Sequence, residues 1–442
     1  MSARGRGARI VSEMLLRGGT LAAFDPPRVE PGDLRIEGER IAARGRGLEP
    51  QDGEAVVELD GAVVIPGLVN AHTHLYRTLA RGMPAARRAP RTFADILEKV
   101  WWRLDRALDE EAVYVSALAG AAEAALSGVT LLLDHHSSPS WIRGSLAAVR
   151  RAVEQVGLRS VLCYEVSDRN GAEARHYALE ENVEFQRTEQ TARTRGMVGA
   201  HASFTLSPET MDGIVWAVDQ TGSSLHVHVA EDPLDVEDCR KRYALTLSER
   251  LMRHGLLMSR TVLAHCVHLT AGEIEEIQQN GAWVAHNARS NMNHAVGHAP
   301  TAAMRRVALG TDGLDQDVLA EVHAAFLKMR DAGRGDAQSA ALEMVAGGHR
   351  LGAVLFGLPF GKLDAGGPAD LVVLDYPAPT PLYTDNLAPH LVFGVDRSHV
   401  RDVMVAGRFV VRDHRLKGVD PRSLRALASG VAERLWRRLE VP

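Results

Sequence analysis

Two histidines separated by a single residue follow the first strongly apolar part of the chain. His72 and His74 end the stretch PGLVNAHTH at residues 66–74. In a strand, residues two positions apart point to the same side, so both imidazoles can be directed at one point. Neutral imidazole is the commonest protein ligand for zinc and also binds iron. Two hydrogen-bonded histidines at a strand edge are the alternative, so the pair needs further ligands to be informative.

Further potential ligands stand at the ends of later strand-like segments. His226 and His228 form a second pair, His265 and Asp312 end two other segments, and Glu231 comes three residues after His228. Histidines and an aspartate at strand ends can hold a catalytic metal while leaving one coordination position for water. Glu231 is placed to reach that water as a general base. These residues predict a catalytic metal centre, with His226 one layer deeper.

Polar and aromatic residues near these strand ends are candidates for contacting a substrate. Arg289 is the most suggestive, because a guanidinium can hold a carboxylate or carbonyl through two hydrogen bonds. Tyr76 and Arg77 begin a loop that covers the site or is simply solvated, and Trp102 stacks on a flat ring or belongs to the core. The predicted substrate-binding residues are Tyr76, Trp102, His135, His201, Arg289 and Asn291.

The middle of the chain alternates between apolar strand-like runs and helical patterns. Such alternation is typical of right-handed βαβ units around a parallel sheet, and eight runs fit a (β/α)8 barrel whose active site lies at the carboxyl ends of the strands. A doubly wound sheet is the competing fold, but its Gly-rich phosphate turn is not found. The eight runs are Ala62–Val69, Val129–Asp134, Arg159–Val166, Met197–Phe204, Ser224–Ala230, Thr261–Val267, Ala282–His286 and Val307–Gly310.

Both ends of the chain carry short strand patterns separated by Gly, Pro and Asp. We therefore expect residues 1–66 and 356–442 to form a composite β-sandwich domain, and residues 67–355 to form the catalytic barrel. A long amphipathic helix is predicted over Phe93–Leu108 and a terminal helix over Arg422–Leu439. The TIM-like barrel and the small β domain together account for the whole chain.

Composition narrows the functional class. The 442 residues carry a formal charge of −5, which argues against a nucleic-acid or anionic-membrane partner. Three cysteines cannot form a disulfide framework. No apolar run is long enough for a membrane-spanning helix, and no secretory signal is recognised, so we expect a cytoplasmic protein. A small-molecule substrate is the expected partner, with a homodimer as the candidate assembly.

The motifs as a set resemble the amidohydrolase superfamily, in particular its cytosine deaminase and triazine hydrolase-like branch. The resemblance covers nearly the whole chain and is closest to the SsnA group of aminohydrolases. The stretches that carry it are AHTHLYRTLARGM (71–83), ILEKVWWRLDRAL (96–108), DHHSSP (134–139), CYEVSDRNG (163–171), HASFTLS (201–207) and RSNMNHAVG (289–297). The chain departs from the SsnA pattern at Thr311 and at Asn287-Ala288.

The resemblance implies a role for each of the candidate residues. It implies His72, His74, His228 and Asp312 as metal ligands, Glu231 as the proton shuttle, and His265 as the residue that orients the attacking hydroxide, together with Asp312, or polarises the substrate. Members of the superfamily with two metals usually bridge them with a carbamylated lysine at the end of the fourth strand. None of the five lysines ends a predicted strand. We therefore expect one divalent ion, with Zn2+ favoured and Fe2+ as the alternative.

Three functions are consistent with these residues. The first is a metal-dependent aminohydrolase that deaminates a nitrogen heterocycle, with a metal-activated hydroxide attacking the carbon that bears the amine. The second is a hydrolase that opens a cyclic amide or ureide, which the same residues can perform. The third, from another class, is a non-catalytic metal-binding or scaffold relative, which the complete ligand set disfavours.

Overall fold

Eight parallel strands form a nearly closed barrel in the computed structural model, which describes residues 13–86 and 88–440. The sheet runs in the order β14-β13-β12-β11-β10-β8-β7-β6, and a parallel bridge between Thr73 and Asp312 joins its two ends. The predicted (β/α)8 barrel is thus confirmed. Its strands are β6 (Leu68–Thr73), β7 (Val129–His136), β8 (Arg159–Val166), β10 (Val198–Ala202), β11 (Leu225–Val229), β12 (Val262–His265), β13 (Trp283–His286) and β14 (Val307–Leu309), with β9 (Thr194–Gly196) beside β8.

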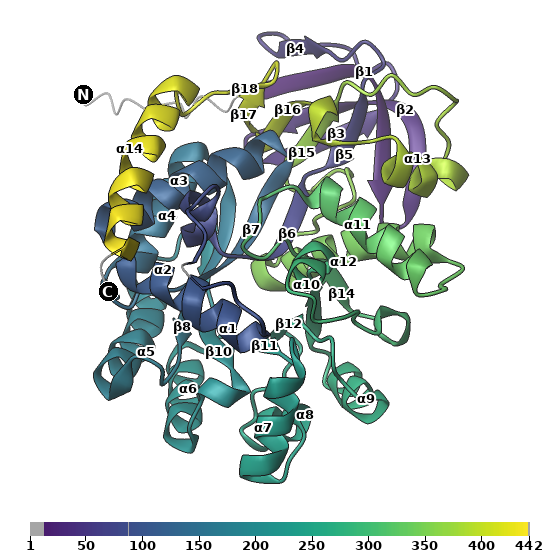
Figure 1. Cartoon of the computed structure of the whole chain (residues 1–442). Helices are drawn as coiled ribbons and strands as arrows, with labels where there is room; N and C mark the ends of the chain where they lie inside the picture. The colour runs from purple at the N-terminus through teal and green to yellow at the C-terminus, as the bar shows by residue number, and fades with distance from the viewer. Residues whose placement is uncertain (1–12, 87, 441–442) are drawn as a thin grey trace, which may run out of the picture.

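Helices surround the barrel and cover the outer faces of its strands (Figure 1). Several begin at side-chain caps, such as Asp109, Ser207 and Thr270, whose oxygens accept backbone N–H groups of the first turn. None of the helices in the described part of the chain is both long and apolar enough to cross a bilayer. The main helices are α3 (Glu110–Leu126), α4 (Ser145–Val156), α5 (Gly171–Thr188), α6 (Pro208–Thr221), α7 (Pro233–Tyr243), α8 (Leu247–Arg253), α9 (Ala271–Gln279), α10 (Ala288–Asn293), α11 (Val318–Asp331) and α12 (Ala337–Phe356).

Strands from both terminal segments form a second, mixed sheet, as expected, but the described residues form one continuous sheet there and not the two packed sheets of a sandwich. Its order is β18-β17-β16-β15-β5-β1-β2-β3, with β4 paired to β1. The first twelve and last two residues of the predicted composite domain lie outside the described residues. The strands are β1 (Glu13–Phe24), β2 (Pro27–Glu37), β3 (Arg40–Gly45), β4 (Ala55–Glu58), β5 (Val63–Pro66), β15 (Leu371–Leu374), β16 (Val400–Val405), β17 (Arg408–Arg412) and β18 (Arg415–Leu416); α13 (Leu387–Phe393) and α14 (Pro421–Glu440) complete the C-terminal part.

The first predicted barrel strand, Ala62–Val69, was wrong in its boundaries because it spans two sheets. Its first part is β5, which pairs with β1 and β15 in the second sheet, and its end belongs to β6 of the barrel. Gly67 is the crossing point, where a Cβ would lie 2.2 Å from the Thr130 hydroxyl oxygen. Only glycine permits this close approach, so the apolar run is continuous in sequence while the sheet changes.

The segment that covers the open end of the barrel is an interrupted helix. The predicted single helix over Phe93–Leu108 is instead α1 (Phe93–Ile96), a π-helical stretch at Leu97–Trp101 and α2 (Trp102–Ala107). Phe93 and Leu97 pack against Val267 and Val296, which belong to loops after β12 and α10. The segment therefore rests on loops at the carboxyl end of the barrel, beside the strand ends where ligands were predicted.

Candidate metal centre

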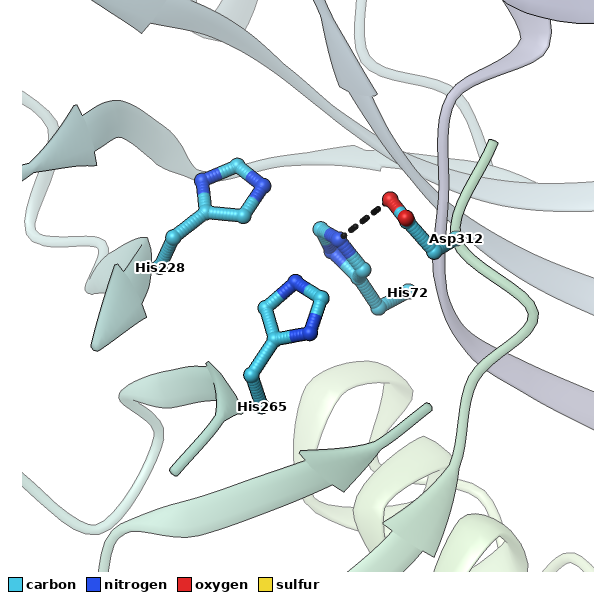
Figure 2. Close-up of side chains that lie close together, drawn as sticks. All are labelled: His72, His228, His265 and Asp312. Carbon is cyan, nitrogen blue, oxygen red and sulfur yellow. Dashed lines mark ion pairs between the residues drawn. The ribbon is translucent and has the colours of Figure 1, made fainter. Parts of the chain in front are cut away.

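A buried group of three histidines and one aspartate lies at the carboxyl end of the barrel. His72 comes from β6, His228 from β11, His265 from the end of β12, and Asp312 from the segment after β14. One potential ligand atom from each lies within 4.8 Å of those of the other three. The four side chains point toward a common space (Figure 2). Residues up to 240 positions apart thus converge because parallel strands end at the same rim.

His74 belongs to the same group, as its position in the histidine pair predicts. Its Nε2 atom lies 3.0 Å from the Asp312 Oδ1 atom and 3.3 Å from the His228 Nε2 atom. The His72 Nε2 atom lies 3.5 Å from the same Asp312 oxygen. All four residues expected to bind the metal, and His265, therefore surround one space.

Hydrogen bonds on the far side of two rings decide which nitrogen carries the proton. His74 Nδ1–H donates to the His135 carbonyl at 2.6 Å, and His228 Nδ1–H donates to the His201 carbonyl at 3.0 Å. In the neutral rings both Nε2 atoms then carry lone pairs. These lone pairs face each other and the Asp312 carboxylate, with no proton available between them.

Such an arrangement is unfavourable unless a cation lies between the three atoms. The His72 Nε2 and Asp312 Oδ1 atoms are also buried and lack a hydrogen-bond partner among the described residues. Buried polar atoms are normally paired, so the unpaired ones need an occupant. Nitrogen and carboxylate donors of this number suit a divalent transition metal. The residues present therefore fit the metal that the sequence predicts.

The charge states of these residues agree with metal binding. Burial lowers the pKa of His74 and His228 well below the ordinary value, and that of His72 below it, so the rings are neutral ligands. Burial alone would raise the pKa of Asp312, but its contacts with His72 and His74 hold the pKa well below the ordinary range. The site thus presents neutral imidazoles and one ionised carboxylate, the forms that ligate metals.

Glu231 lies beside this group, just after β11. Its Oε2 atom is 3.6 Å from the His265 Nε2 atom, and its Oε1 atom is 3.1 Å from the His294 Nδ1 atom. Burial alone would raise the pKa of Glu231, but His265 and His294 keep it below its ordinary value. A carboxylate held ionised next to the candidate metal site can accept a proton from water.

Two residues at the site are held in an uncommon backbone conformation. His265 and Asp312 have φ angles of 73° and 54°, in the left-handed region that non-glycine residues rarely adopt. Such conformations occur where the surrounding structure fixes a side chain for a function. Here they turn the His265 ring and the Asp312 carboxylate toward the other ligands.

Of the predicted substrate-binding residues, His201, Trp102, His135 and Tyr76 lie near the metal centre, whereas Arg289 and Asn291 are engaged with other protein groups. His201 and Trp102 face each other at the rim, with ring centres 6.1 Å apart, and His135 has an unpaired Nδ1 atom 3.6 Å from Glu165. Burial lowers the pKa of His135 to about 3. Tyr76 is almost fully buried, and its hydroxyl accepts a hydrogen bond from Arg77.

Arg289 and Asn291 contact protein groups instead of facing the centre. The Arg289 guanidinium makes three hydrogen bonds to two carboxylates: its Nε–H donates to Glu321 at 2.6 Å, and its two Nη groups donate to Asp315 at 2.7 and 2.8 Å. The Asn291 Oδ1 atom lies 2.8 Å from the His265 Nδ1 atom. Arg289 is therefore a structural ion-pair residue, and Asn291 orients His265.

Sequence reasoning missed two residues that contact the centre. His294 is hydrogen-bonded to Glu231, and the Ser290 hydroxyl donates to the Asp312 Oδ2 atom. Both lie within the stretch RSNMNHAVG that follows β13, so their position near a strand end was the available signal. No residue pattern tells which members of that stretch point inward.

Comparisons with known proteins show which family the chain is similar to. The sequence matches the amidohydrolase family over residues 63–410. It is 32% identical to 5-methylthioadenosine/S-adenosylhomocysteine deaminase of Desulforudis audaxviator, covering 91% of this chain and 95% of that one. It is 30% identical to 5'-deoxyadenosine deaminase of Methanothermobacter thermautotrophicus, covering 93% and 96%.

Solved structures show the same fold. An adenosine deaminase from Xanthomonas campestris with bound zinc has a TM-score of 0.84 at 24% identity, covering 96% of this chain and 98% of that one. Atrazine chlorohydrolase from Arthrobacter aurescens complexed with zinc has a TM-score of 0.82 at 23% identity, covering 95% and 100%. At these identities the likeness establishes the architecture, including the barrel that carries the candidate metal centre.

Proposed function

Because the chain belongs to the amidohydrolase family, we propose that it uses one divalent cation to deaminate an amino-substituted nitrogen heterocycle by hydrolysis. The observation that carries this proposal is the convergence of unprotonated His74 and His228 Nε2 atoms on the Asp312 carboxylate, next to Glu231. Relatives with 30–32% identity are named as deaminases of adenosine derivatives, which supports an amino heterocycle as the substrate.

His72, His74, His228 and Asp312 would hold the cation, and zinc fits their nitrogen and oxygen donors, with Fe2+ as the alternative. When bound, the metal supplies Lewis acidity that lowers the pKa of water toward 7 and so makes hydroxide available at neutral pH. His265 also lies within ligand distance of the group. Its hydrogen bond with Asn291 and its proximity to Glu231 favour a role in orienting water and substrate.

Glu231 is the proposed proton shuttle. Its carboxylate accepts the proton of the attacking water and passes it to a ring nitrogen, as the carbon that bears the amine becomes tetrahedral. The hydroxyl now on that carbon gives its proton to the amine, the carbon–nitrogen bond breaks, and ammonia leaves while the same oxygen becomes the oxo group of the ring. His294 fixes one carboxylate oxygen at 3.1 Å, which leaves the other directed toward His265 and the metal centre.

Product analysis tests this function and separates it from the alternatives. The metal-loaded protein would be assayed against amino-purines, their nucleosides, amino-pyrimidines, hydantoins and ureides. Ammonia release with formation of the oxo heterocycle is the expected result. A ring-opened acid without ammonia would favour the cyclic amide or ureide hydrolase, and bound metal with no turnover across the panel would contradict the aminohydrolase and favour a scaffold.

A further inference from the structure

Arg77 places a buried positive charge beside the candidate metal centre. It follows the histidine pair on the 3-10 turn Leu75–Ala80, and only 8% of its surface is exposed. Its Nη1 atom lies 3.7 Å from the Asp312 Oδ1 atom, the oxygen that faces the histidine ligands. This separation exceeds hydrogen-bond length, so Asp312 compensates the charge without accepting a hydrogen bond.

The guanidinium is fixed in place although most of its donors are unused. Its Nε–H donates to the Tyr76 hydroxyl at 3.1 Å, and its central carbon lies 4.5 Å from the Trp101 ring centre. A Cβ on Gly313 would lie 2.4 Å from the Arg77 Cδ atom, so the glycine after Asp312 provides the room for this side chain. Within the described residues, neither Nη atom makes a hydrogen bond.

The other two arginines near the centre differ in this respect. Arg169 contacts Glu165 and Asp105, and Arg289 is held by Glu321 and Asp315. A buried guanidinium whose planar fork has no acceptor is unusual, because its desolvation must be offset by hydrogen bonds. Both Nη groups of Arg77 are therefore free to donate to an acceptor that enters the site.

We propose that Arg77 binds an exocyclic oxygen of the substrate, an oxo group or oxyanion carried by the same ring as the amine. This inference rests on the proposed deamination. A guanidinium donates charge-assisted hydrogen bonds to such an oxygen, whose two lone pairs can accept from both Nη groups, whereas a ring nitrogen offers a single lone pair. The substrate class is therefore an oxo-substituted amino heterocycle, in distinction from the adenine ring named in the relatives, which has no exocyclic oxygen.

Matched compounds that differ by one oxo group test this proposal. Adenine would be compared with isoguanine, which is 2-oxoadenine, and 4-aminopyrimidine with cytosine. We measure kcat and KM in the wild-type protein, Arg77→Met and Arg77→Lys, with metal content determined for each. Binding of the same compounds is measured by calorimetry in the Glu231→Gln background, where turnover does not interfere.

The wild-type protein is expected to prefer the oxo member of a pair, and Arg77→Met to lose about 10- to 100-fold in kcat/KM and affinity for that member alone. Arg77→Lys keeps the charge beside Asp312 but not the planar fork, so it should recover only part of this loss. Metal content should stay at the wild-type level in both variants.

Three results would overturn the proposal. Equal losses for both members of a pair would show that Arg77 does not read the oxygen. Loss of metal in Arg77→Met would show that it acts through Asp312. Absence of a binding preference for the oxo compounds in the Glu231→Gln background would also exclude it. If the proposed deamination is itself wrong, the result is different: metal-loaded wild-type protein then releases no ammonia from any compound of the panel.

Discussion

Individual residues at the centre either hold the metal or move protons. Their hydrogen bonds determine which of these two roles each side chain can have. His74 and His228 each donate a proton away from the centre, so their inner nitrogens can only accept. Glu231 instead faces His265 and His294 and remains ionised. Variants of the two groups should therefore fail in different ways.

Glu231→Gln is expected to keep the metal and lose turnover by about 10²–10⁴-fold, because a positioned general base contributes that much. His72→Ala is the contrasting variant and should lose metal together with activity. Metal analysis of the purified proteins and kcat measurements check both. Metal loss in Glu231→Gln would mean that this carboxylate is a ligand instead of a base.

Metal stoichiometry is a second prediction at this scale. His135, Glu165 and His228 also come within 4.8 Å of one another and resemble a second cation site. The Arg169 guanidinium already contacts Glu165 and donates to Asp105, so the buried carboxylates have their counter-charge. A divalent cation bound to Glu165 would be strongly repelled by the Arg169 guanidinium. We expect activity to saturate at one metal equivalent during titration of apo-protein; a second equivalent that raises the rate would contradict the mononuclear site.

Much of the centre was predictable from the sequence because strand ends converge in any parallel barrel. The histidine pair, His228, Asp312 and Glu231 needed only their position after apolar runs. The ion pairs of Arg289 could not be predicted in this way, because its partners Glu321 and Asp315 lie on another part of the chain and no local pattern reveals them.

At the scale of elements, the covering segment shows where periodicity misleads. Its apolar spacing predicts one continuous helix, but the π-helical stretch at Leu97–Trp101 changes the direction of the residues after it. Trp101 consequently faces Arg77 and Trp102 faces Arg169, with guanidinium carbons 4.5 and 5.1 Å from the ring centres. π-Helical turns are often found at functional sites, which agrees with this contact with two buried arginines.

Another contact between elements gives a pH prediction. His349 on α12 stacks on Phe24 of β1, and its Nε2–H donates to the Gly67 carbonyl at the crossing between the sheets. Burial lowers the pKa of His349 to about 4, although the Gly67 hydrogen bond opposes this. In the unfolded chain the pKa is about 6.5. Between these values the unfolded state binds the extra proton, so the free energy of unfolding decreases as pH falls.

His349→Gln removes this titration while its amide can still donate to Gly67. From pH 6.5 to 4.5 the wild-type protein should lose about 2–3 kcal/mol more stability than the variant, at about 1.4 kcal/mol per pH unit. Denaturant unfolding of both apo-proteins at pH 8, 7, 6.5 and 4.5 checks this, and the difference between their free energies of unfolding should be constant between pH 8 and 7. An equal pH dependence throughout would show that His349 is not held neutral.

At the scale of the whole molecule, the barrel and the terminal sheet are joined by buried charges as well as by apolar packing. Arg159 at the start of β8 donates to Asp370 just before β15, and both side chains are 2% exposed. Asp370 also accepts from the Ala406 N–H group. The composite sheet was predictable from strand patterns at both ends, but this ion pair was not, since its partners are 211 positions apart.

Asp370→Asn should destabilise the protein by about 3 kcal/mol or more, because it leaves the Arg159 charge buried without a counter-ion. The matched control is Asp364→Asn, whose side chain is 49% exposed and pairs with Arg28 and Arg44; its cost should be below about 1 kcal/mol. Denaturant unfolding of the wild-type protein and the two variants measures both differences.

The double variant Arg159→Met/Asp370→Leu removes both charges and should be more stable than Asp370→Asn, because a buried pair costs desolvation that apolar residues avoid. A double variant as unstable as Asp370→Asn would show that the position requires packing or the Ala406 hydrogen bond, and that the unpaired charge is not the cause.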